Sequence, residues 1–443
     1  MSPLRVILFF LAGAMVAGPL SAFGETGSGE DHLIIISPHR KSLQEEMVPG
    51  FRKAWKKKHG REVKVDWLDQ GGTADDIRFI RGRYAQDPKS AGIDIFWGGG
   101  TATYTELDRQ GVLVPVALSP ELEKQIPAKA GSVSLRSPTG NWHATAMSGF
   151  GIFYNKMVLQ MSRLPTPTTW HDLADPAFEG MISLADPRRS GTTNTLINIL
   201  LQINGWEKGF QLLTALAANT RQFTHSSSDP IKAVVSGDAA VALTIDFYAL
   251  AKISSLGTEG LGFVMPAGQT VLDPDPVAML KGAPHPQVAT AFIHYLLSVE
   301  AQQKLMLPAG SEGGPERHFL GRFAVNPLAY DATLGRSLAG TNPFKGGEFF
   351  PYDAGRSGIR QKVINDLVGT LLIDAGPGLH RAWRHLQKGG ISPAELQNLA
   401  KMPVSEAGLD AMVTRWDDHR YRNRIINGWT EFATQKYDGL LAH

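Results

Sequence analysis

The sequence predicts an α/β protein with two strand–helix domains, followed by a helical C-terminal region. Short apolar segments that end in glycine-rich or polar turns alternate with helical patterns up to about residue 275. The length of 443 residues is typical of two or three domains, because single domains commonly contain about 100–200 residues. From residue 359 onward the pattern is helical.

The first alternation starts near the N-terminus. Residues 33–36 form a short apolar segment that is typical of a buried parallel strand. Residues 43–60 follow as an amphipathic helix, with lysines and a glycine at its end. Thr73 with Asp76 indicates a capped helix start. The later elements of this domain are predicted as strands at 63–68 and 93–97 and a helix at 104–110.

The second alternation repeats the same order. Its predicted strands are residues 151–154, 181–185 and 241–245. Its predicted helices are a short one from residue 169 and a long one through residue 203. The chain then turns through residues 273–276 into an apolar segment at 277–280, and a single helix is expected from about 286 to 307.

Composition excludes several classes of protein. The absence of cysteine excludes disulfides, thiolate metal sites, iron–sulfur clusters and a cysteine nucleophile. A net charge of +2 argues against nucleic-acid binding, which usually requires a concentrated basic face. The main rival class is an enzyme, but the G-x-S-x-G, H-E-x-x-H and phosphate-loop motifs are absent. Neither a cofactor nor a bound metal is expected.

The N-terminus predicts export. Arg5 precedes an apolar segment at 6–18, which is shorter than the about 20 residues needed to span a bilayer. Small residues at Ala22 and Gly24 then indicate a cleavage site before Glu25. We therefore expect a signal peptide at 1–24 and a periplasmic product.

Four segments resemble the periplasmic solute-binding proteins of ABC importers, in the branch that binds ferric iron, sugar phosphates and aminophosphonates. The resemblance covers about residues 33–326. It is carried by 147–156 (MSGFGIFYNK), 167–180 with its P-T-T-W-H-D-L start, 245–248 (IDFY), and 278–302 with its A-M-L-K-G-A-P-H-P start.

The resemblance implies a type II two-lobed periplasmic-binding-protein fold with two crossover strands. The last ~100 residues exceed the usual length of the family, and their pattern predicts a C-terminal helical extension. Lobe one would comprise 31–146 plus 276–345, lobe two 147–275, and the extension 346–443. It also implies a monomer that closes its lobes on a small solute and delivers it to an ABC permease in the inner membrane. The same lobes could instead present ligand to a sensor kinase or chemoreceptor.

Loops at strand ends are the candidate ligand-binding segments, because open α/β sheets bind ligands there. In lobe one they follow three strands, and their free N–H groups and helix starts suit an anion. The glycines permit close approach of the backbone to a ligand. The residues we single out are Ser37, His39, Gly72, Thr73, Gly99 and Thr101.

In lobe two, a segment between a strand and a helix combines a guanidinium, hydroxyls and backbone N–H groups. Its residues Arg188, Ser190, Gly191 and Thr192 predict a clamp for an oxyanion. The sequence leaves open which of Arg188 and Arg189 faces the ligand. The clamp favours an anionic organic solute, such as a sugar phosphate, a phosphonate or a carboxylate.

The crossovers supply the last candidates. Asp246 and Tyr248 at a strand end, Asp275 near the second crossover and Ser148 at the first are predicted to contact the solute. The resemblance implies paired tyrosines in iron binders, whereas this chain has Phe247 beside Tyr248. Ferric iron is therefore the alternative ligand, with one phenolate missing.

Overall fold

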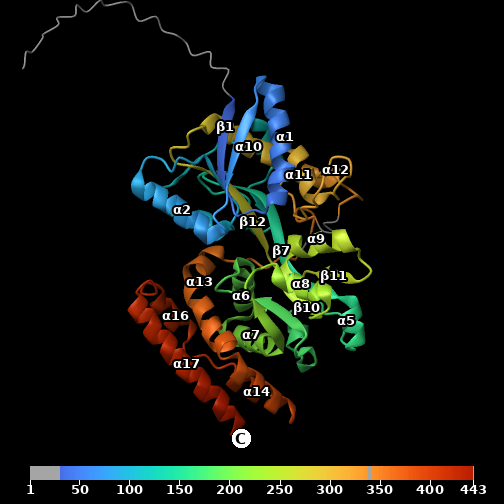
Figure 1. The fold of residues 1–443 in the computed structure, drawn as a ribbon, viewed down its shortest axis with the longest axis vertical. Coiled ribbons are helices and arrows are strands. Elements are labelled where there is room, and N and C mark those ends of the chain that lie inside the picture. The colour runs from blue at the N-terminus through green and yellow to red at the C-terminus, as the bar shows by residue number, and fades with distance from the viewer. Residues whose placement is uncertain (1–29, 338–341, 347, 443) are drawn as a thin grey trace, which may run out of the picture.

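The computed structural model describes residues 30–337, 342–346 and 348–442. Two α/β lobes lie one above the other, and two long strands run between them (Figure 1). The predicted export signal lies outside the described residues. Within the described ranges, no helix combines the length and the apolar character that crossing a bilayer requires.

We call residues 30–147 and 272–337 lobe one. The domain limits predicted from the sequence remain a prediction. Its first strand pairs in parallel with the two that follow it, as expected. Its strands are β1 (Asp31–Ile36), β2 (Val63–Leu68), β3 (Ile95–Trp97), β4 (Leu113–Val114), β5 (Lys129–Ala130) and β6 (Val133–Ser134). Its helices are α1 (Lys41–His59), α2 (Thr73–Gln86), α3 (Thr101–Arg109), α4 (Pro120–Gln125), α10 (Pro286–Leu297), α11 (Val299–Met306) and α12 (Pro327–Ala332).

We call residues 148–271 lobe two. Its central strand pairs in parallel with both neighbours, β9 and β10. Its strands are β8 (Ile182–Ala185), β9 (Thr220–Thr224), β10 (Val241–Ile245) and β11 (Leu261–Val264). Its helices are α5 (Lys156–Met161), the short 3₁₀ helices η1 (His171–Ala174) and η2 (Pro176–Phe178), α6 (Gly191–Asn204), α7 (Trp206–Asn219), α8 (Asp229–Ser236) and α9 (Asp246–Leu256).

Two antiparallel strands, β7 (His143–Asn155) and β12 (Leu272–Leu280), join the lobes into one sheet of order β2-β1-β3-β12-β7-β10-β8-β9. The turn predicted at residues 273–276 is wrong, because these residues belong to β12. The carbonyl of Pro276 accepts from the N–H of Gly98, on the side away from β7. In a strand the N–H and C=O of a residue point to the same side, so the missing N–H of Pro276 costs no bond to β7.

Two helix predictions also need correction. The single helix expected over 286–307 is interrupted at Ser298, whose hydroxyl accepts from the N–H of Ala301 and starts α11. Thr73 does not cap α2: Gly72 is the cap residue, and Thr73 is already helical. Asp76 instead accepts from the N–H of Gln70, in the loop that enters the helix.

The C-terminal extension packs on lobe two, beside α6 and α7 (Figure 1). Its helices are α13 (Ala354–Val368), the π-helix η3 (Gly369–Asp374), α14 (Gly376–Gln387), α15 (Pro393–Leu399), α16 (Glu406–Val413) and α17 (His419–Leu441). One hydrophobic core contains side chains of both parts, including Phe210 of α7 and Trp383 of α14. The extension therefore completes the core of lobe two.

The segment before α13 passes between the lobes. The N–H of Gly268 donates to the carbonyl of Glu348, and the N–H of Phe350 donates to the carbonyl of Thr270. Phe349 packs against the core of lobe one, whereas Phe350 packs against the core of lobe two. Residues 348–350 are thus a third stretch of chain between the lobes, alongside β7 and β12.

Candidate functional site

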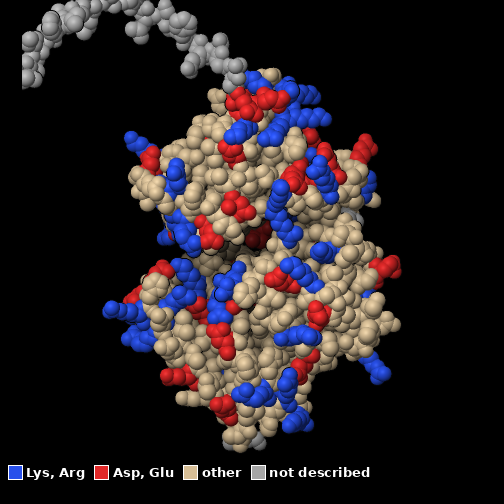
Figure 2. Space-filling model, viewed as in Figure 1, with Lys and Arg blue, Asp and Glu red and all other residues tan. Residues whose placement is uncertain are grey.

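A hollow lies between the two lobes, and an acidic side chain is visible in its depth (Figure 2). Arg40, the residue that precedes α1, contacts Tyr248 in the first turn of α9. The start of α1 in lobe one therefore faces the start of α9 in lobe two. Both helices follow a strand end, β1 and β10, which is the position where open α/β sheets bind ligands.

A buried polar network lines the lobe-one side. The Nε2 of His39 lies 2.7 Å from a carboxylate oxygen of Asp275, and its Nδ1 lies 2.9 Å from the hydroxyl of Ser37. Arg322 forms an ion pair with the same carboxylate. Because both ring nitrogens of His39 are used inside the protein, the ring orients Asp275 and presents no free nitrogen to a ligand.

The charges of this network follow from burial and contact. Burial lowers the pKa of His39, so the imidazole is neutral near pH 7. Burial alone would raise the pKa of Asp275, but His39 and Arg322 outweigh it and lower that pKa to about 2. The network therefore holds one carboxylate and one guanidinium whose charges cancel.

Two cation–π contacts cross the space between the lobes. The guanidinium of Arg40 lies 3.8 Å from the ring centroid of Tyr248, and that of Arg322 lies 4.4 Å from the ring centroid of Phe247. No carboxylate of the described residues forms an ion pair with Arg40. Arg40 thus places an unbalanced positive charge at the start of α1, where the helix dipole adds to it.

Asp246 begins α9 and is fully buried. One of its oxygens accepts from the N–H of Gly149 at 2.7 Å, and the other accepts from the N–H of Phe247 at 2.6 Å. Burial nevertheless raises its pKa to about 7. The nearby hydroxyl of Ser148 is buried and faces the carboxyl of Asp246, whose pKa it lowers in part.

A second carboxylate with a raised pKa comes from β12. Burial, together with the neighbouring charge of Asp275, raises the pKa of Asp273 to about 7. Asp273 accepts a hydrogen bond of 3.3 Å from the hydroxyl of Thr101, the first residue of α3. Near neutral pH, the carboxyls of Asp246 and Asp273 can each donate a hydrogen bond when protonated and accept one when ionised.

The glycine loop before α3 is required by close packing. Gly98 and Gly99 have φ values of 101° and 95°. A Cβ at Gly98 would lie 2.7 Å from the ring of His39, and one at Gly99 would lie 2.6 Å from the methyl group of Thr73. The three lobe-one loops predicted from the sequence are therefore brought together, as their positions at strand ends suggested.

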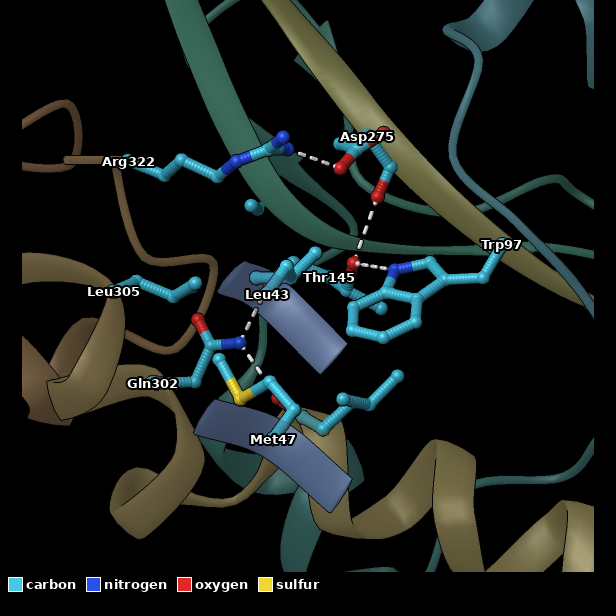
Figure 3. A pocket seen from close by; sticks show the side chains of 10 residues that line it. Leu43, Met47, Trp97, Thr145, Asp275, Gln302, Leu305 and Arg322 are labelled. Atoms are coloured by element: carbon cyan, nitrogen blue, oxygen red, sulfur yellow. Dashed lines mark hydrogen bonds and ion pairs between the residues drawn. The ribbon is translucent and has the colours of Figure 1, made fainter. Parts of the chain in front are cut away.

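A small cavity lies behind the site, within lobe one (Figure 3). Its volume of about 10 Å³ fits at most one water molecule. The hydroxyl of Thr145 donates to the carbonyl of Asp275 at 2.9 Å and accepts from the indole N–H of Trp97 at 2.8 Å. The cavity is too small for a solute, but it shows how β12 is fixed to the core behind the hollow.

The oxyanion clamp predicted at the start of α6 is only partly present. Ser190 caps α6, accepting from the N–H of Thr193 at 3.1 Å, and Gly191 begins the helix. Arg188, however, binds Asp186 and Asp374, each at 2.7 Å. Its guanidinium is therefore balanced by two carboxylates, one of them from the extension, and does not have the open geometry that the clamp requires.

The remaining members of the clamp stay predictions. Thr192 lies in the first turn of α6. Arg189 is exposed and forms no ion pair with any residue that the structure describes. Of the two arginines that the sequence left open, Arg189 is therefore the one whose charge is available.

Sequence reasoning missed four residues of the site. Arg40 directly follows the predicted Ser37–His39 loop, and its position before a helix was a usable signal. Phe247 was considered only as a missing phenolate, and Asp273 was assigned to a turn. Arg322 lies in a loop without regular structure and carries no sequence signal.

Among residues 30–337, 342–346 and 348–442, no group of three or more His, Cys, Asp or Glu side chains is arranged to hold a metal ion.

Residues 93–309, about half of the chain, match the family described as bacterial extracellular solute-binding protein. One relative is the phosphoglycerate transport regulatory protein PgtC of Salmonella typhimurium, 31% identical over 205 residues, or 46% of this chain and 48% of PgtC. Another is the iron uptake protein A2 of Synechocystis, 26% identical over 233 residues, or 50% of this chain and 63% of that protein. The chain thus matches about half of the length of PgtC.

Solved structures show the same fold. The periplasmic binding protein AfuA of Actinobacillus pleuropneumoniae, with fructose-6-phosphate bound, superposes with a TM-score of 0.59 at 22% identity, covering 77% of this chain and 98% of AfuA. The apo ferric ion-binding protein A of Pasteurella haemolytica gives a TM-score of 0.57 at 17% identity, covering 76% and 96%. At these identities the likeness concerns the fold alone. The chain therefore has the two-lobed fold of the periplasmic binding proteins, and its residues 93–309 match the family of bacterial extracellular solute-binding proteins.

Proposed function

We propose that this protein captures a small anionic organic solute between its lobes in the periplasm and delivers it to an ABC permease of the inner membrane. A sugar phosphate, a phosphonate or a carboxylate is the expected solute class. The observation that carries the proposal is the unbalanced guanidinium of Arg40, which lies in the space between the lobes against Tyr248. The protein would act as a monomeric binding protein and not as an enzyme.

The electrostatics of the hollow support an anion. The charges of Arg322 and Asp275 cancel, and His39 is neutral, whereas Arg40 forms no ion pair with a carboxylate of the residues that the structure describes. An oxyanion at this point would also receive the backbone N–H groups at the start of α1. Charge-assisted hydrogen bonds of this kind contribute roughly 1.5–3 kcal/mol each.

The carboxyls support an organic solute over a bare inorganic anion. Asp246 and Asp273 both have pKa values of about 7. Asp273 offers a hydrogen-bonding group suited to a hydroxyl or an amine, which a sugar phosphate or an aminophosphonate carries beside its anionic group. Both oxygens of the fully buried Asp246 already accept from backbone N–H groups, so Asp246 acts through its charge.

The test is a thermal-shift screen of phosphorylated sugars, phosphonates, carboxylates and ferric citrate, followed by calorimetry of each hit. A ligand at 100 times its dissociation constant adds about 2.7 kcal/mol to the stability. We expect an organic anion to raise the melting temperature of the wild type. We expect Arg40→Ala to weaken its binding tenfold or more.

Arg52→Ala is the matched control, because Arg52 is an exposed arginine of the same helix α1 with no ion pair among the described residues. Equal affinities of the Arg40 and Arg52 variants would contradict the proposal. A response to ferric salts alone would favour the iron alternative, which the name of the Synechocystis relative supports.

A second candidate function is presentation of the bound solute to a regulatory partner. The name of the Salmonella relative, a transport regulatory protein, supports this candidate. Neighbouring genes for a permease and an ATPase would favour transport. A neighbouring gene for a membrane histidine kinase or chemoreceptor would favour regulation.

A further inference from the structure

Helix α13 of the extension lies next to both lobes, against α3 of lobe one and α6 of lobe two (Figure 1). Toward lobe two it forms a dense set of polar contacts. The side-chain amide of Gln202 donates to the carbonyl of Asp353 at 3.0 Å and accepts from its N–H at 2.9 Å. The amide of Asn194 in α6 donates to Gln361 at 2.9 Å. These bonds fix both the start and the middle of α13 to lobe two.

The rest of the extension strengthens this attachment. Asp374 of η3 binds Arg188 with both carboxylate oxygens. The buried indole N–H of Trp383 donates to Asn219 at 3.0 Å. Together with the shared hydrophobic core, these contacts make the extension and lobe two one mechanical unit.

Toward lobe one the contact is of a different kind. Among the described residues, no hydrogen bond or ion pair joins α13–α17 to lobe one. Instead, α13 packs against α3, and Gly358 approaches Ala102 so closely that an added Cβ would lie 3.2 Å from the Ala102 methyl group. Such a contact can separate and re-form without breaking a polar bond.

The contact between Gly358 and Ala102 lies close to residues that line the hollow. Ala102 is the second residue of α3, directly after Thr101, which binds Asp273. The lobes also meet at a separate point, where Arg40 contacts Tyr248. Lobe one therefore touches lobe two where α1 meets α9, and it touches the extension where α3 meets α13.

We propose that the extension is a stop, fixed to lobe two, against which α3 comes to rest when the lobes approach. The Gly358–Ala102 contact then sets how far the hollow can close. That this closure captures a solute rests on the proposed function, whereas the stop itself is a property of the free protein. Glycine at position 358 allows the closest approach, so any larger side chain acts as a wedge.

The test measures the distance between the lobes without a solute. The chain has no cysteine, so Lys57→Cys in α1 and Gln160→Cys in α5 provide two exposed and unique sites for spin labels. Pulsed electron spin resonance then gives the distribution of distances between the labels. We expect Gly358→Leu to shift this distribution to longer distances, because the leucine holds α3 away from α13.

Gly428→Leu in α17 is the matched control, since position 428 is an exposed helical glycine with no heavy atom within 4 Å of an added Cβ. It should leave the distances as in the wild type. Ala102→Leu places the wedge on the opposite helix and should act like Gly358→Leu. If neither wedge changes the distances while both variants remain folded by circular dichroism, the stop does not exist.

Should Gly358→Leu fail to fold, Gly358→Ala and Ala102→Leu test the same contact, because each adds fewer atoms between α3 and α13 than Gly358→Leu does. Solute affinity separates the two proposals. A shift in distances with no solute found in the screen supports the stop and counts against the proposed function. Unchanged distances with a tight solute support the function and overturn the stop.

Discussion

Arg40 and Tyr248 stand 208 positions apart in the chain, yet the guanidinium of the first lies 3.8 Å from the ring centroid of the second. One belongs to lobe one and the other to lobe two. The contact therefore links the two halves of the molecule at the edge of the space in which a solute would bind.

Replacing the ring tests the strength of this contact. Tyr248→Leu removes the π-face and should lower the melting temperature, because a cation–π contact contributes about 0.5–2 kcal/mol. Tyr248→Phe keeps the face and should melt close to the wild type. A Phe variant as unstable as the Leu variant would show that the hydroxyl, and not the ring, carries the interaction.

The network at Asp275 predicts a large effect on stability. Asp275→Asn leaves the guanidinium of Arg322 buried without its carboxylate, which should cost about 3–5 kcal/mol in urea unfolding. Asp331→Asn is the control, because its ion pair with Lys345 is exposed and should contribute at most about 1 kcal/mol. Similar losses for both variants would contradict the buried character of the network.

The raised pKa of Asp273 predicts how stability depends on pH. Between the ordinary value of 3.8 and about 7, the folded protein keeps a proton that the unfolded chain has released. Stability should therefore fall as the pH rises through this window and stay lower above it. Asp273→Asn removes the titrating group, so its melting temperature should exceed that of the wild type at pH 8 by more than at pH 5. Parallel pH profiles would show that the pKa of Asp273 is not raised.

The same carboxyls predict the pH dependence of binding. Protonation of Asp246 and Asp273 near pH 7 removes negative charge from the hollow. An anionic solute that keeps its own charge should therefore bind more tightly at pH 6 than at pH 8 in calorimetry. A cation such as ferric iron should show the opposite trend, which distinguishes the two ligand classes.

Arg188 should act on stability and not on binding. Arg188→Met removes its contacts with Asp186 and Asp374, and so loosens the extension from lobe two. We expect a lower melting temperature with an unchanged solute dissociation constant. Arg189→Ala, at an exposed position, should leave the melting temperature unchanged. Loss of binding in a stable Arg188 variant would restore the clamp that the sequence suggested.

The sequence predicts elements best where local pattern determines them. The short apolar segment at residues 33–36 predicted a buried strand, and it is part of β1. The pattern predicted a turn at Pro274 and Pro276, where the structure has a strand. A proline lacks an N–H and therefore argues against a strand, unless the strand that lies on the side of the missing N–H is known. The break at Ser298 was missed for a related reason, since apolar spacing continues on both sides of it.

For the site, the resemblance and the strand ends indicated lobe-one loops that the structure brings together, but not the pairing of charges. Nothing local shows that Arg188 is balanced by Asp374, because the two are 186 positions apart. Arg322 is in the same situation, since its role depends on Asp275 and on the ring of Phe247. Pairs of residues that lie so far apart in the chain can be identified only from the three-dimensional structure.

The shared core of lobe two and the extension also bears on the order of folding. Val363, Leu371 and Trp383 fill the same core as Leu200 and Phe210. During synthesis the middle of the chain emerges well before these partners, so its apolar surface stays uncovered until the last residues follow. Lobe one needs no residue beyond 349 for its core and can fold earlier. A nascent chain arrested before residue 363 should therefore contain one protease-resistant lobe and one that is still digested.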